Sequence, residues 1–71
     1  MLTQEINILL DTLRRLNRRN AHANLKKILH KTHPADLATI FRYLTEPERR
    51  EIFPLITDRN HASEVLSEMD D

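Results

Sequence analysis

Two glutamates near the end of the chain, Glu64 and Glu68, have a spacing that would let them bind one metal ion. Residues four apart share one face of a helix, where two like charges cost a few tenths of a kcal/mol. A divalent cation that takes oxygen ligands would relieve that repulsion. The plainer interpretation is two solvated surface carboxylates, and the spacing alone leaves both open.

Histidines offer a second kind of metal site. His30 and His33 are three residues apart, but a zinc site needs three or four ligands in a definite geometry. We therefore expect His33 to fix the start of a helix. His22 and His61 belong to no cluster in the sequence.

Clustered arginines offer a phosphate-binding surface. Four of them lie between Arg14 and Arg19, and such clusters neutralise nucleic-acid or lipid phosphates. The chain as a whole has no net charge, and its three aromatic residues lie outside the basic run, where they cannot stack on bases. We expect a solvated helix face, no nucleic-acid partner and no insertion into a membrane.

Groups for enzyme catalysis are missing from the pattern. The chain has no cysteine and no glycine, which excludes a thiolate nucleophile and a glycine-rich phosphate loop. Ser63 and Ser67 have no histidine and aspartate at a suitable spacing. We expect a protein that is not an enzyme and that presents a surface.

Helix-forming residues dominate the 71-residue chain, and nothing in it alternates like a strand. Charge is unevenly placed: residues 1–33 carry a net charge of +5 and residues 34–71 a net charge of −5. The sequence therefore predicts one all-α domain over residues 1–71, with a basic half and an acidic half.

Helix starts recur about every 12 residues, at His33-Pro34, Thr45-Glu46 and Thr57-Asp58. Short helices that repeat in this way bury their apolar stripes against one another, as in helical-repeat stacks. Thr45 and Glu48 form the pattern of a capping box. We expect helices over about 3–19 and 21–31, with Asn20 as the break between them. A third helix should start at Pro34, and a fourth, capped by Thr45, should bend or end near Phe53 because of Pro54. The last should run over about 58–69, with Thr57 as its cap.

Apolar spacing predicts the residues that face the core. The central set is Leu37, Ile40, Phe41, Leu44, Ile52 and Phe53. Tyr43 should point partly outward. In the last helix the apolar stripe is Ala62, Val65, Leu66 and Met69.

Three segments occur in a fixed order: HPADLA at 33–38, PERR at 47–50 and ASEVLSEMD at 62–70. With this order and spacing, the chain from about residue 20 to 71 resembles the N-terminal cytosolic domain of the MgtE family of magnesium transporters. The resemblance implies a right-handed superhelix of about five short helices. Residues 1–19 would form a leading helix before the family-matching region.

The resemblance also implies a function. In that family the domain docks against a pair of CBS domains, Mg²⁺ binds between them, and a transmembrane channel closes. The first glutamate of the third segment, which is Glu64 here, takes part in ion binding in that family. Glu68 lies one turn further on. The resemblance thus implies a bacterial, cytoplasmic regulatory domain at the inner membrane, monomeric alone, whose partners are CBS domains and a transmembrane domain.

Departures from the family pattern leave fewer acidic side chains on the expected ion-facing surface. Asn20-Ala21 replaces the usual Gly-Asp, and Thr39, Arg42 and Tyr43 stand where glutamates are common. The chain ends at Asp70-Asp71, before further acidic ligands of the family, so we expect it to be part of a longer protein. The alternative is a helical protein-interaction scaffold with no ion role, and the reading frame beyond Asp71 would discriminate between the two.

Overall fold

The computed structural model describes residues 3–69. Five α-helices and one short 3-10 helix follow one another there, with no strand in this range. The elements are α1 (Gln4–Arg18), α2 (His22–Lys31), α3 (Pro34–Tyr43), α4 (Glu46–Ile52), η1 (Phe53–Leu55) and α5 (Arg59–Met69). The predicted all-α class is confirmed, whereas a right-handed superhelix stays a prediction.

Asn20 ends the first helix, as the sequence predicts. Its φ of 57° lies in the left-handed region, which Asn tolerates better than most residues other than glycine. The Asn20 N–H donates to the Asn17 carbonyl, and the Ala21 N–H donates to the Leu16 carbonyl. These two bonds define a Schellman motif. A chain without glycine therefore turns from α1 to α2 on an asparagine.

Side chains cap the starts of three helices at the expected positions. The Thr3 hydroxyl accepts from the Ile6 N–H at 3.2 Å, and His33 Nδ1 accepts from the Ala35 N–H at 3.1 Å. Thr45 and Glu48 form the predicted capping box. Each bond satisfies an N–H that has no partner within its helix.

The last helix begins one residue later than predicted and has a different cap. The Asp58 carboxylate, and not Thr57, accepts from the N–H groups of Asn60 and His61 at 2.9 and 3.3 Å. A carboxylate there also favours the positive end of the helix. Before it, α4 ends at Ile52 and gives way to η1, because Pro54 lacks the N–H that a longer helix would need.

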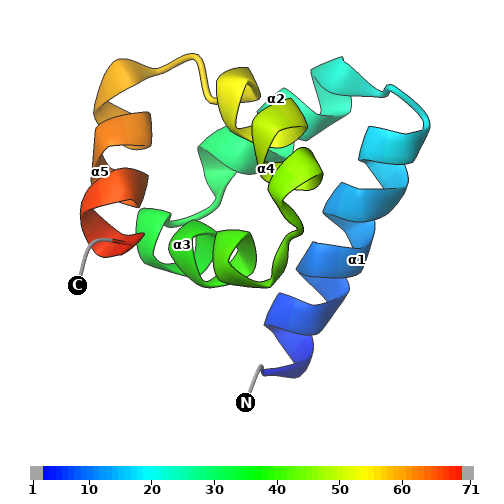
Figure 1. Cartoon of the computed structure of the whole chain (residues 1–71), viewed down its shortest axis with the longest axis horizontal. Helices are drawn as coiled ribbons and strands as arrows, with labels where there is room; N and C mark the ends of the chain where they lie inside the picture. The colour runs from blue at the N-terminus through cyan, green and yellow to red at the C-terminus, as the bar shows by residue number, and fades with distance from the viewer. Residues whose placement is uncertain (1–2, 70–71) are drawn as a thin grey trace.

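The helices surround one core, with α1 and α5 at opposite ends of the long axis (Figure 1). The most extensive packing joins α3 to α5, while α1 packs on α2, α3 and α4. Each of the five α-helices contributes to a buried cluster: Leu10, Leu13, Leu25, Leu29, Leu37, Ile40, Phe41, Leu44, Ile52, Ile56 and Val65.

Two expectations about the core are wrong. Phe53 is only half-buried; its ring packs edge-on against Phe41 with centroids 5.8 Å apart. Leu66 is 54% exposed, because α5 buries only the side centred on Val65 and a stripe of four residues is wider than that contact. The other predicted central residues are buried, and Tyr43 is 49% exposed, as expected.

Candidate functional site

The last helix, α5, has a buried side and an open side. Val65 is fully buried, and Ala62 and Met69 pack partly against the same cluster. Glu64 and Glu68 are both exposed. Since they lie one turn apart, their carboxylates share one strip of the helix surface.

Neither carboxylate of this pair has a partner within residues 3–69. No hydrogen bond or ion pair in that range involves the side chain of Glu64 or Glu68. The same part of the chain holds no group of three or more His, Cys, Asp and Glu side chains arranged to bind a metal. Two hard oxygen donors are thus available on α5, and further ligands would have to come from elsewhere. Asp70 and Asp71 lie outside the described residues.

A positive charge stands at the end of this strip. Arg42, in the last turn of α3, donates from Nη2 to the Glu68 carbonyl oxygen at 3.2 Å. That bond satisfies one of the last carbonyls of α5, which have no partner within the helix. A cation bound to the pair would therefore meet less repulsion beside Glu64 than beside Glu68.

Two histidines form hydrogen bonds that join the start of α5 to α2. His30 Nδ1 lies 2.8 Å from the Lys26 carbonyl oxygen and therefore donates, which leaves Nε2 to accept from the Asp58 N–H at 3.3 Å. His61 Nε2 lies 3.0 Å from the Leu29 carbonyl oxygen. The two rings are 5.8 Å apart. The structure thus pairs His30 with His61, and His33 caps α3 by itself.

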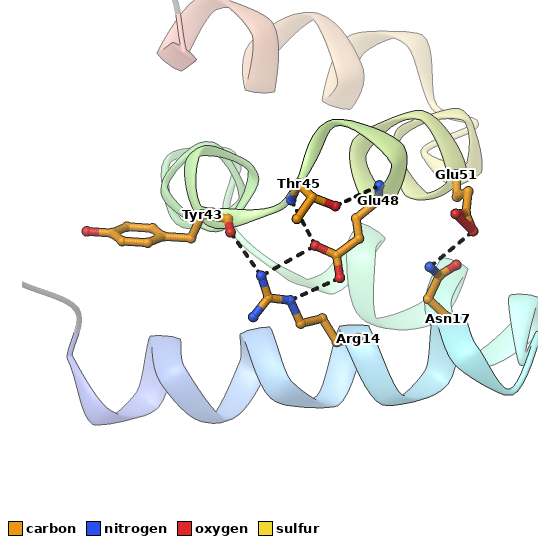
Figure 2. Close-up of polar contacts among 6 residues, drawn as sticks. All are labelled: Arg14, Asn17, Tyr43, Thr45, Glu48 and Glu51. Carbon is orange, nitrogen blue, oxygen red and sulfur yellow. Dashed lines mark hydrogen bonds and ion pairs between the residues drawn. The ribbon is translucent and has the colours of Figure 1, made fainter.

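A hydrogen-bonded contact, which we call the clasp, joins α1 to the turn between α3 and α4 (Figure 2). It consists of Arg14, Tyr43, Thr45 and Glu48. Arg14 donates from Nε to Glu48 Oε2 at 3.1 Å and from Nη2 to Glu48 Oε1 at 3.3 Å. The same Nη2 donates to the Tyr43 carbonyl oxygen at 3.0 Å. Glu48 Oε1 also accepts from the Thr45 N–H at 2.8 Å. One carboxylate thereby serves both the capping box and the contact between helices.

The surroundings of Glu48 favour its charged form. Burial raises the pKa of this carboxyl, but hydrogen bonds from the Thr45 backbone and the Arg14 guanidinium lower it, helped by the Thr45 side chain and the Arg14 charge. The net result is a pKa below the ordinary value of 4.5. Further along α1, Asn17 donates to Glu51 at 3.4 Å and adds a weaker link to α4.

Sequence reasoning missed both long-range contacts. In the sequence, Arg14 belongs to a basic run and Glu48 is half of a capping box. His30 and His61 share no sequence pattern. In each case more than thirty residues separate the partners, and nothing in the local pattern of either side chain points to the other.

Comparison with known families identifies the kind of domain. Residues 32–71 match the model of the MgtE intracellular N domain, and this is more than half of the chain. The chain therefore belongs to the MgtE intracellular N domain family, whose members are domains of magnesium transporters. The match begins at Thr32, so α1 and α2 precede it. No curated protein and no solved structure matches the chain.

No helix within residues 3–69 is both long enough and apolar enough to cross a lipid bilayer.

Proposed function

We propose that this chain is a regulatory domain that docks against CBS domains in a Mg²⁺-dependent way and so gates transport through a magnesium channel. The proposal is supported by membership of the MgtE intracellular N domain family. The observation that assigns the ion site to particular residues is the exposed strip of α5. There the side chains of Glu64 and Glu68 have no partner within the described residues.

The ion chemistry fits a site shared between two domains. Mg²⁺ keeps several waters and is usually bound through one or two carboxylates from a protein segment. Two carboxylates on an exposed helix hold it weakly, because water competes for the same positions. When a second domain adds its own oxygen ligands, the ion binds the docked arrangement more tightly than the open one.

The difference in Mg²⁺ affinity between the docked and the open arrangement would open and close the channel. An ion shifts a conformational equilibrium only by its differential affinity for the two states. Typical coupling factors between sites are about 5–150-fold. At low Mg²⁺ the domain would leave its partner and the channel would open, and at high Mg²⁺ it would dock and the channel would close.

The test is a titration of the ¹⁵N-labelled chain with MgCl₂, alone and with a CBS-domain pair from an MgtE transporter of the same organism. We expect small amide shifts for the chain alone at millimolar Mg²⁺. With the CBS pair present, we expect shifts centred on Glu64 and Glu68, and docking about 5–150-fold tighter than without the ion.

The variant Glu64→Gln/Glu68→Gln should retain the helical fold and lose the Mg²⁺ dependence of docking. The matched control is Glu5→Gln, which removes an exposed carboxylate from α1, at the opposite end of the molecule (Figure 1). Docking that is equally tight in EDTA and in Mg²⁺ would contradict the proposal and favour an interaction scaffold with no ion role.

A further inference from the structure

The segment between Asp11 and Asp36 contains no acidic residue and seven Lys and Arg residues. Arg14 is neutralised by Glu48 in the clasp. The other six are all exposed, and none of their side chains makes a hydrogen bond or ion pair within residues 3–69: Arg15, Arg18, Arg19, Lys26, Lys27 and Lys31. The cationic charge of this segment is therefore almost entirely available to a partner.

Five of these side chains lie within about two helical turns of the Asn20 bend that joins α1 to α2. We call this group the basic corner, and its members are Arg15, Arg18, Arg19, Lys26 and Lys27. In Figure 1 the α1–α2 bend lies at the upper right and α5 at the left, at opposite ends of the long axis. The basic corner and the carboxylates of α5 thus face different surroundings.

Two kinds of anionic partner could bind the basic corner, a lipid bilayer and a nucleic acid. The observations favour the bilayer. Residues 3–31 contain no Phe, Tyr or Trp side chain on which a base could stack. The family is that of an intracellular domain of a transporter, and the cytoplasmic leaflet beside a transporter is anionic. Ile8, 58% exposed, lies two turns before Arg15 on the same side of α1 and adds an apolar contact at the interface.

We propose that the basic corner binds the anionic surface of the bilayer, peripherally and without inserting a helix. Bound in this way, the domain would hold α5 away from the membrane, on the side where a cytosolic partner and its ion are accessible. The contact requires neither Glu64 nor Glu68, so it can be tested separately from Mg²⁺-dependent docking.

The experiment is co-sedimentation of the chain with phosphatidylcholine vesicles that contain either no anionic lipid or about one-third phosphatidylglycerol. EDTA is present throughout, because Mg²⁺ would screen the lipid. We expect binding to the anionic vesicles at low salt, little binding to the neutral ones, and a loss of at least tenfold as monovalent salt rises to about half molar, where charges are screened beyond roughly 4 Å.

Arg18→Gln/Arg19→Gln removes two charges from the basic corner and should weaken vesicle binding roughly 25-fold, since each Lys or Arg near an anionic surface is worth about fivefold. The matched control, Arg50→Gln/Arg59→Gln, removes two exposed charges from the acidic half and should stay within about twofold of the wild type. Circular dichroism establishes that both variants retain the helical fold. Glu64→Gln/Glu68→Gln should bind vesicles as the wild type does.

Three outcomes would overturn the proposal. The first is failure to bind anionic vesicles at low salt, and the second is an equal loss in both arginine variants. The third is tighter binding to a DNA duplex than to vesicles at the same salt, with that binding lost in Arg18→Gln/Arg19→Gln, which would assign the corner to nucleic acid. None of these outcomes depends on the CBS partner, so Mg²⁺-dependent docking stands or fails independently.

Discussion

The two helices before the family match differ from the three that lie in it. Helices α1 and α2 carry most of the Lys and Arg residues, and α3 to α5 carry most of the carboxylates. Yet both regions contribute to one buried cluster, with Leu13 and Leu25 from the first and Phe41 and Val65 from the second. Charge thus divides the domain where packing does not, and the family-matching region shares its core with helices that precede the match.

The largest expected effect comes from the core of the family-matching region. Phe41 is 1% exposed, and Phe41→Ala should lower the free energy of unfolding by about 3–5 kcal/mol, through lost burial and the cavity left behind. For a 71-residue domain that is most of the stability. Urea denaturation followed by circular dichroism measures it, with the exposed Tyr43→Ala as control. An effect below about 1 kcal/mol would mean that the cluster is not the core.

The next effect tests whether α1 belongs to the same cooperative unit. Leu13 is fully buried, and Leu13→Ala should cost about 2–5 kcal/mol. If the two regions share a core, the whole chain should still unfold in one transition. Hydrogen exchange of α5 amides would then accelerate along with those of α1. Loss of protection in α1 alone would separate the regions.

A smaller effect is expected from the clasp between the regions. Arg14→Met retains the apolar stem but leaves Glu48 without its charged donor. It should cost about 1–2 kcal/mol, near the low end for hydrogen bonds to charged groups, because both side chains are partly exposed. The matched control is the ion pair of Arg50 with Glu46, whose side chains are 75% and 72% exposed. Arg50→Met should change stability by no more than about 0.5 kcal/mol. Equal effects in denaturation experiments would show that the clasp is an ordinary surface pair.

The smallest effect is the pH dependence that Glu48 contributes. Its folded pKa lies below 4.5, so its carboxylate stabilises the fold fully above about pH 4.5 and progressively less as the pH falls toward the folded pKa. Glu48→Gln should therefore reduce stability at neutral pH and flatten the loss of stability below pH 4.5. Urea midpoints at several acidic pH values measure this. The flattening should shrink in the Arg14→Met background, and if it did not, Arg14 would not be a cause of the lowered pKa.

Much of the fold follows from short-range chemistry. A cap such as His33 or Thr45 acts on N–H groups two or three residues away, so the sequence contains the whole interaction. The break at Asn20 is equally local. The exposed carboxylates of α5 were also predicted, because helical spacing and the family resemblance both point to Glu64 and Glu68. Their role as ion ligands stays a prediction.

Local sequence patterns are therefore enough to predict the all-α class, the helix starts to within one residue, the central core apart from Phe53, and the basic and acidic halves. The contacts of Arg14 with Glu48 and of His30 with His61, and the exposure of Leu66, follow only from the folded arrangement. The reason is physical. Caps and helical periodicity involve neighbours along the chain, whereas these contacts depend on how whole helices are oriented against one another, which is set by packing over the entire core.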